Sequence, residues 1–482
     1  MRRALSTGAR RAALLAGERG TIRRETPAIV ALGYPAPYGV AVSSLGFQTV
    51  YRAWNALPGL TCVRFFAAEG PGRVGQLLAA ETGRPVAAAR AIAFSVSCET
   101  ELQGLVRLLR SAGLSPLAAE RGADDPPVIV GGPLTSLDPR LVAPFADAVV
   151  VGEAEELLEP LGEAIVSARG RDEFLDAIGT SRCGLWRSLL EPEPPEPAVA
   201  PVGVLPAFAA TWSSAAELKD LFLVEATRGC ARACAFCVLA RRSGGAGVFR
   251  AVPAARILAA VTEGAPGVGL VGAAVTDHPE IEDIVRAVVA RGRRASLSSI
   301  RADRLTPGLA SALVAGGLAT ITLSADGASQ RLRDRIRKGI TGDDLARAAS
   351  VAASAGARNL KIYAMAGLPT EEDEDVLELA ALVRSLDARL RLSVAVQAFV
   401  PKPGTPLARE PMADPGVIRR RVALLRSALA GRATVLPTSP RWSWLDWKLA
   451  HSGRKAALAA VAAERAGGGF GAWRAAIEEL GL

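Results

Sequence analysis

Short apolar runs alternate with amphipathic stretches along most of the chain, and their spacing changes near its middle. Between residues 25 and 165 the predicted strands are short and rich in β-branched residues. They cover Pro27–Val40 (a strand and turn), Thr61–Ala67, Ala91–Val96, Pro127–Val130 and Ala146–Val151, and the predicted helices cover Leu45–Leu57 and Glu99–Ala112. This alternation is typical of a parallel sheet with helices on both faces, where ligands bind beyond the carboxyl ends of the strands.

From Leu221 onward the alternation resumes with longer units. Six strands are predicted, each followed by a helical pattern: Leu221–Ala226, Val268–Ala273, Ala295–Ser299, Thr320–Ser324, Asn359–Ala364 and Arg391–Val396. Six repeats of this kind predict a (β/α)6 partial TIM barrel, whose chemistry is expected at the carboxyl ends of the strands.

The fold class is therefore expected to be α/β, in five segments along the chain. These are a basic N-terminal extension (1–24), a Rossmann-like parallel-sheet domain (25–185), a Pro-rich linker (186–215), a barrel core (216–410) and a small helical C-terminal region (411–482). The linker contains Glu-Pro-Glu-Pro-Pro-Glu-Pro, which is too polar and too rigid for a packed element. The tail has helical periodicity in Val417–Ala430 and Ala456–Arg465, and its Trp442, Trp444 and Trp447 are interpreted as core anchors.

Composition limits the functional classes. A length of 482 residues suggests two or three domains, and no uninterrupted apolar run is long enough to cross a bilayer. The net charge of +9 comes mostly from Arg spread along the chain, so we expect no DNA partner, although an RNA substrate stays open. The Arg- and Ala-rich start is interpreted as a surface helix or poorly ordered extension rather than a transit peptide.

Three cysteines carry the strongest chemical signal. Cys230, Cys234 and Cys237 have the spacing C-x3-C-x2-C, and Phe236 directly precedes the last one. Thiolates this close together can hold three corners of a four-iron cluster and leave one iron without a protein ligand. A structural zinc site is disfavoured because it needs four ligands and the chain has only two distant histidines. Such a cluster implies a reducing compartment, and we expect the cytoplasm.

This triad resembles the signature of the radical SAM superfamily. The resemblance implies a 4Fe–4S cluster on the three cysteines, with S-adenosylmethionine (SAM) bound to the open iron beside Phe236. It also implies that an electron from the cluster splits SAM to give a 5′-deoxyadenosyl radical. An electron donor such as flavodoxin or ferredoxin would then be a partner.

Later strand ends in residues 221–407 resemble further elements of the same superfamily. The resemblance implies that Gly272 lies where a backbone segment holds the SAM amino group, and that Gly367 lies in a turn beside the adenine. Arg301 could pair with the SAM carboxylate or form a surface salt bridge. After the fourth strand, the resemblance implies that Ser329, Arg331 and Lys338 lie near the polar end of SAM. It also implies that Asp326, which replaces the usual Glu, lies near the SAM ribose or amine.

The first domain resembles that of an uncharacterised radical SAM family with a cobalamin-binding-like domain. The similarity lies in Tyr34-Pro-Ala-Pro-Tyr38, Ser43-Ser-Leu-Gly46, Gly131-Gly-Pro133 and Gly152-Glu153. It implies that Gly131 and Gly132 could hold a corrin through their backbone. The motif Asp-x-His-x-x-Gly, whose His would bind cobalt, is absent, so cobalamin binding without a histidine ligand and a domain without cobalamin both stay open.

The resulting expectation is a radical SAM enzyme, with a cobalamin-dependent methyltransferase as one reading. The other is a cobalamin-independent enzyme that modifies RNA, a peptide or a metabolite. No catalytic residue and no substrate are indicated by the residues themselves. A methylthiotransferase is disfavoured because no second cysteine triad exists.

Overall fold

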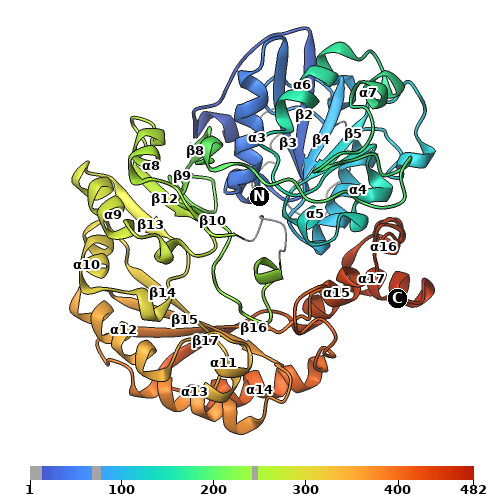
Figure 1. The fold of residues 1–482 in the computed structure, drawn as a ribbon. Helices are drawn as coiled ribbons and strands as arrows, with labels where there is room; N and C mark the ends of the chain where they lie inside the picture. The colour runs from blue at the N-terminus through green and yellow to red at the C-terminus, as the bar shows by residue number, and fades with distance from the viewer. Residues whose placement is uncertain (1–12, 68–76, 242–247) are drawn as a thin grey trace, which may run out of the picture. The chain divides into compact units, whose positions relative to one another are not determined.

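The computed structural model describes residues 13–67, 77–241 and 248–482. The chain forms two compact units. The first unit joins Met1–Leu223 with Lys448–Leu482, and the second unit comprises Val224–Trp447 (Figure 1). Among the described residues, no helix combines the length and apolar character of a membrane span.

The first unit contains a six-stranded sheet in the order β3-β2-β4-β5-β6-β7. The strands are β2 (Ala28–Tyr34), β3 (Leu60–Phe66), β4 (Ala91–Ser95), β5 (Val128–Gly131), β6 (Ala148–Val150) and β7 (Leu185–Trp186). All neighbours pair in parallel except β6 and β7, which pair antiparallel. The predicted parallel sheet is confirmed, and its first five strands have the flavodoxin-like order 2-1-3-4-5.

Six helices of the first unit follow in sequence between and after these strands. They are α2 (Tyr38–Ala41), α3 (Leu45–Ala56), α4 (Leu102–Ser111), α5 (Pro133–Leu137), α6 (Leu158–Ser167) and α7 (Arg171–Ala177). Helix α3 buries Phe47, Tyr51 and Trp54 in one apolar core with β2, β3 and α6. The β-branched runs that predicted the strands thus form the buried layer between the helices.

The end of the chain returns to the first unit. Helices α16 (Lys455–Arg465) and α17 (Gly469–Glu479) belong to it. The Glu464 carboxylate accepts hydrogen bonds from Arg107 at 2.9 Å and Gln103 at 2.7 Å, both on α4. The Trp473 indole donates to Gln103 at 2.8 Å. Residues 411–482 are therefore shared between the two units.

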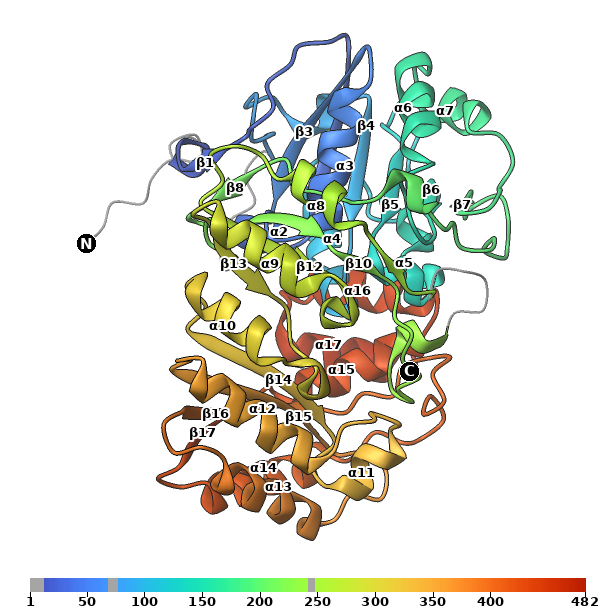
Figure 2. The ribbon, with the colours of Figure 1, turned by 60° about the vertical axis from the view of Figure 1, so that its left-hand side comes forward.

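The second unit contains two sheets, β13-β12-β9 and β14-β15-β16-β17, joined by a parallel bridge between Ile300 and Leu323. Their strands are β9 (Phe222–Glu225), β12 (Gly267–Val271), β13 (Arg294–Leu297), β14 (Thr320–Asp326), β15 (Asn359–Ala366), β16 (Arg391–Ala398) and β17 (Ala433–Pro437). All six predicted strands are present, and β17 is an additional one. The last four strands are parallel neighbours (Figure 2).

Helices cover the outer side of these strands (Figure 1). They are α8 (Ala254–Ala260), α9 (Ile281–Ala290), α10 (Pro307–Ala315), α11 (Gln330–Arg335), α12 (Gly342–Ser354), α13 (Asp373–Ser385) and α14 (Pro415–Ala428), and α15 (Pro440–Ala450) spans the division between the units. Along β14 and β15 buried residues alternate with half-buried ones. The buried set faces the helices, so the half-buried set faces the inside of the partial barrel.

Two short ribbons complete the structure. Strand β1 (Glu18–Arg19) pairs antiparallel with β8 (Trp212–Ser213), and β10 (Thr227–Arg228) pairs antiparallel with β11 (Arg250–Ala251). The first ribbon joins the expected N-terminal extension to the expected linker. Parts of both segments are therefore packed into the first unit.

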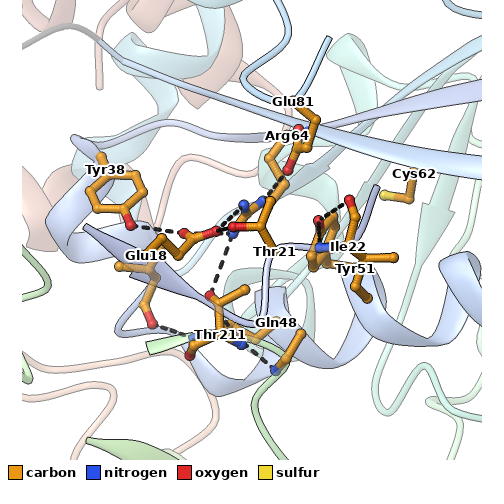
Figure 3. A network of polar contacts seen from close by, with 12 residues as sticks. Glu18, Thr21, Ile22, Tyr38, Gln48, Tyr51, Cys62, Arg64, Glu81 and Thr211 are labelled. Carbon is orange, nitrogen blue, oxygen red and sulfur yellow. Dashed lines mark hydrogen bonds and ion pairs between the residues drawn. The ribbon is translucent and has the colours of Figure 1, made fainter. Parts of the chain in front are cut away.

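A buried ion network holds the β1 segment in place (Figure 3). The guanidinium of Arg64 donates to Glu18 at 2.5 Å and to Glu81 at 2.6 Å, and all three side chains are almost fully buried. The Tyr38 hydroxyl donates to Glu18 at 2.8 Å, and the Tyr51 ring lies 4.2 Å from the Arg64 guanidinium. One cation therefore compensates two carboxylates that come from distant parts of the sequence.

We predict that Arg64→Met destabilises the protein more than Glu18→Gln does. Loss of Arg64 leaves two buried carboxylates without a cation, at a cost of about 3–5 kcal/mol. Glu18→Gln removes one charge but leaves the Arg64–Glu81 pair, at a cost of about 1–3 kcal/mol. Urea unfolding followed by tryptophan fluorescence measures both. The exposed control Arg23→Met is expected within about 0.5 kcal/mol of the wild type, and an Arg64→Met protein of similar stability would contradict this account.

Candidate functional site

The cysteine loop follows β9 and β10 and is fixed to the rest of the second unit. The Ala235 amide donates to the Ile336 carbonyl at 2.8 Å, and the Leu407 amide donates to the Ala235 carbonyl at 3.3 Å. The Cys237 amide donates to the Cys234 carbonyl at 3.0 Å. The first two bonds attach the cysteine loop to the segment before α12 and to the segment after β16, and the third bond lies within the loop.

All three cysteines line one cavity of about 360 Å³, together with Phe236. Arg232 of the same loop and Lys338, which lies between α11 and α12, also line it, and the other lining residues come from the carboxyl ends of β12 to β16 and the loops after them. The cysteines therefore lie at the face that barrel enzymes use for chemistry.

The donor set fits a cluster with three protein ligands. Cys234 is buried, and this burial raises the pKa of its thiol, while nearby Lys338 acts in the opposite direction. A bound metal deprotonates a thiol that ligates it. Among the described residues, no three His, Cys, Asp or Glu side chains converge as ligands of a single ion. A cubane, in contrast, binds each thiolate to a different iron, and the adjoining cavity leaves room beside it.

An ion pair forms one wall of the cavity. The Lys338 ammonium donates to the Asp326 carboxylate at 2.6 Å, and both residues line the cavity. Asp326 has a φ of 58°, which is costly for a residue other than glycine. A register shift between Ser324 and Asp326 accompanies this conformation. Strain of this kind at a strand end is typical of functional sites.

Arg301 ties this wall to the end of β13. Its guanidinium donates to Asp303 at 3.0 Å and to the carbonyls of Lys338 at 3.2 Å and Gly339 at 3.1 Å. Only 8% of Arg301 is exposed, so its interactions are not those of a surface salt bridge. Arg301 lines the cavity, and its contact with a SAM carboxylate stays a prediction.

A second guanidinium lies beside the first cysteine. Arg232 lines the cavity and donates to both carboxylate oxygens of Asp277, at 2.7 and 3.0 Å. Burial alone would raise the pKa of Asp277, but the hydrogen bonds and charge of Arg232, with Arg301 and Arg304 nearby, lower it overall. Asp277 is thus held as an anion that orients Arg232.

Ser329 and Arg331 do not line the cavity. The Ser329 hydroxyl donates to Asp375 at 2.5 Å and caps α11 through the Leu332 amide. Arg331 donates to the same carboxylate and to the carbonyl of Thr370 at 2.9 Å. Both residues are thus joined to the start of α13, and their predicted contact with SAM is untested.

Gly272 lies where a side chain would have no space, and Gly367 has a left-handed backbone conformation. A Cβ on Gly272 would lie 2.6 Å from the Thr227 carbonyl oxygen, and Ala273 and Ala274 next to it line the cavity. Gly367 has a φ of 88°, and its amide donates to the Glu371 carboxylate. Their predicted roles beside SAM stay predictions.

The two glycines of the first unit are constrained by internal packing. A Cβ on Gly132, at φ 106°, would lie 2.6 Å from the Val96 carbonyl oxygen, and one on Gly131 would lie 3.2 Å from Val150 Cβ. Close packing against β4 and β6 thus accounts for both. Cys98 lies just after the carboxyl end of β4. The residue before it, Ser97, has its hydroxyl 2.8 Å from the Tyr34 hydroxyl. Corrin binding at the two glycines stays a prediction.

His278 is a structural residue of the second unit. It is 3% exposed, its Nδ1 accepts from the Glu280 amide at 3.0 Å, and its Nε2 lies 2.7 Å from the Val252 carbonyl oxygen. One nitrogen accepts and the other donates, which is the pattern of a neutral ring.

Sequence reasoning missed several cavity residues. The cavity is also lined by six residues for which the sequence indicated no individual role: Thr276, Ser299, Ser324, Tyr363, Met365 and Gln397. Tyr363 and Met365 belong to the half-buried set of β15, so the alternation of that strand could have identified them.

Two family models match separate parts of the sequence. Residues 46–183 match the family described as "Radical SAM proteins, N-terminal", and residues 224–383 match "Radical SAM superfamily". The first range lies in the first unit, and the second range lies in the second unit.

The chain is also similar to a curated relative and to solved structures. The uncharacterised protein MJ0966 of Methanocaldococcus jannaschii is 31% identical over 288 residues, which is 58% of this chain and 60% of that protein. The chain therefore spans less than two thirds of this curated relative. The radical SAM methyltransferase TsrM from Kitasatospora setae, solved with tryptophan substrate and a SAM analogue, is 14% identical with a TM-score of 0.57, and the similarity covers 91% of this chain and 99% of that one. The cobalamin-dependent enzyme OxsB, solved with aqua-cobalamin, is 13% identical with a TM-score of 0.50, over 76% of this chain and 53% of that one. Both structures share the fold.

We predict that Cys234→Ala abolishes assembly of the 4Fe–4S cluster, because only three thiolates are available to hold it. Anaerobic reconstitution, followed by measurement of the absorbance from sulfur-to-iron charge transfer in the cluster, tests this prediction. Cys183→Ala is the matched control, since Cys183 is exposed and lies in the first unit, and it should leave the spectrum intact. An unchanged spectrum in Cys234→Ala would exclude the triad as the ligand set.

We also predict a pH-dependent stability that originates at Glu371. Burial raises the pKa of this carboxyl to about 7, although the Gly367 amide and Arg421 act against the rise. The folded pKa lies above the unfolded value of 4.5. The contribution is therefore fully present below pH 4.5 and is lost as the pH rises through about 7, by up to about 3 kcal/mol. Urea unfolding at pH 5 and pH 8 should show this loss in the wild type and not in Glu371→Gln; equal pH dependence in both proteins would refute it.

Proposed function

The chain belongs to the radical SAM superfamily, and from this we propose that it is an enzyme that cleaves SAM reductively at a 4Fe–4S cluster held by Cys230, Cys234 and Cys237. The observation that carries the proposal is that these three cysteines line one cavity together with residues from the carboxyl ends of β12 to β16. The cluster and SAM are the cofactors of the superfamily.

The chain's own residues hold and orient the reactants in this proposal. When bound, the cluster supplies the electron that breaks the S–C5′ bond of SAM, and cobalamin, when bound, carries a methyl group. Phe236 and Met365 supply apolar surface to the cavity. Lys338 with Asp326, and Arg232 with Asp277, supply charges that are already paired and therefore fixed in position. Such fixed charges suit a zwitterionic cofactor, whose ammonium and carboxylate need opposite partners.

We propose methyl transfer as the reaction, which makes the enzyme a transferase with a cobalamin cofactor. Two observations support this. The first unit has a flavodoxin-like strand order, whose ligand sites lie at the carboxyl ends of strands. TsrM, whose fold is shared across 91% of this chain, is named as a radical SAM methyltransferase.

A cobalamin-independent enzyme that modifies RNA, a peptide or a metabolite is the alternative. The observation that favours it is that both histidines, His278 and His451, lie outside residues 25–185, so no histidine there can bind cobalt. In both cases we propose a cytoplasmic enzyme that receives electrons from a flavodoxin or ferredoxin, with a small molecule, peptide or RNA as substrate.

The reconstituted protein is expected to form 5′-deoxyadenosine or S-adenosylhomocysteine from SAM under reducing, anaerobic conditions. Liquid chromatography of the products measures this, with Cys234→Ala as the inactive control. A corrin spectrum in the protein purified from cobalamin-supplemented cells would support methyl transfer. Its absence, with 5′-deoxyadenosine still formed, would favour the alternative, and absence of both products would exclude the proposal.

A further inference from the structure

One row of polar residues crosses the inner face of the partial barrel. Thr322 of β14 pairs in register with Lys361 of β15, which pairs with Ser393 of β16. Ser393 pairs in turn with Thr434 of β17. Side chains in register on parallel neighbours point the same way and are about 4.8 Å apart, so the Lys361 side chain is flanked by hydroxyls from both adjacent strands.

The strand alternation places this row on the inner face. On β15, Leu360 and Ile362 are buried beneath the helices, whereas Lys361 is half-buried and belongs to the same set as Tyr363. Tyr363 lines the cysteine cavity, and so does Ser324, which is two residues beyond Thr322 on β14. The row therefore lies one layer, or about 6–7 Å, from residues that line the cavity.

Polar residues here are unusual for a barrel. The interior of a TIM barrel is normally filled by bulky branched side chains that pack as a core. Thr322, Lys361 and Ser393 are polar and half-buried instead. The row is thus better suited to a ligand than to a core.

Lys361 differs from the other cationic residues of this region because it has no partner. Within the described part of the chain, the cavity cations are paired: Arg232 with Asp277, Arg301 with Asp303 and Lys338 with Asp326. In the same described part, neither the Lys361 ammonium nor the Thr322 and Ser393 hydroxyls have a hydrogen bond or ion pair. A half-buried ammonium without a counter-ion is unfavourable, and an anion placed here would relieve that cost.

We propose that Thr322, Lys361 and Ser393 form a subsite for a carboxylate of the substrate. The ammonium and the two flanking hydroxyls supply donors for both carboxylate oxygens, and one positive charge matches one negative charge. A nucleic-acid backbone would need several cations in an array, whereas this row has one. The inference rests on the proposed function, since it implies that the substrate is a carboxylic acid whose reacting end extends from this row toward the cysteine cavity.

A lysine-specific NMR titration tests the subsite directly. The chain has six lysines: Lys219, Lys338, Lys361, Lys402, Lys448 and Lys455. Reductive methylation of the full-length protein with ¹³C-formaldehyde labels each ammonium and keeps its charge. The Lys361 signal is assigned by its loss in Lys361→Arg. Sodium acetate, acetamide and sodium phosphate are then added separately, and the exposed Lys455 serves as the reference within the same spectrum.

We expect acetate to move the Lys361 signal saturably, and acetamide to leave it in place. The double variant Thr322→Val with Ser393→Ala should weaken the apparent acetate affinity at least threefold, and the single variant Ser393→Ala gives the same comparison if the double variant does not fold. A Lys361 shift no larger than that of Lys455, or an equal response to acetamide, would overturn the subsite. Tighter binding of phosphate than of acetate would assign the row to a phosphate ester and refute the carboxylate.

The outcome is separable from that of the proposed function. The titration does not depend on SAM cleavage, so a saturable acetate shift in a protein that forms neither SAM product would leave the subsite standing and remove the proposed function. The opposite pair of results would leave the enzyme and remove the subsite.

Discussion

The site depends on the parallel pairing of strands in the second unit. Parallel strands end on the same side of a sheet, so the loops after β12, β13, β14, β15 and β16 must meet at one edge. The cysteine loop is fastened to the same edge by backbone bonds to Ile336 and Leu407. A short local motif is thereby combined with residues more than a hundred positions later, and neither part would form a cavity alone.

Charge compensation is the second feature of this edge. Arg232, Arg301 and Lys338 each have a carboxylate partner, which fixes their direction before any ligand binds. Fixed charges lose little freedom when a ligand arrives, and this preorganisation favours binding. Lys361 lies one layer farther into the partial barrel, and none of the described residues supplies a carboxylate partner for its ammonium. The three paired cations thus form part of the cavity wall, whereas for Lys361 we propose a carboxylate of the substrate as the partner.

The sequence was informative where the interaction is local. The three cysteines lie within eight residues, and each of the six predicted strands of the second unit contains apolar residues and is followed by a helical pattern, so both features could be predicted. Strand β17 was missed because only Val435 in it is buried, which leaves no apolar alternation to detect. The Trp residues of α15, interpreted as core anchors, are half-buried. Ser329 and Arg331 are bound to Asp375, more than forty positions away, and no spacing along the chain indicates that pairing. The same holds for Glu18 and Arg64, which place part of a supposed extension inside the first unit.

The central claim is that three thiolates leave one iron of a cluster open to SAM inside this cavity. Electron–nuclear double resonance of the reduced cluster tests it most directly, using SAM labelled with ¹⁵N and ¹⁷O in the methionine amino and carboxylate groups. We expect hyperfine coupling from both labels in the wild-type protein. A cluster signal without coupling to either label, unchanged when SAM is added, would contradict it.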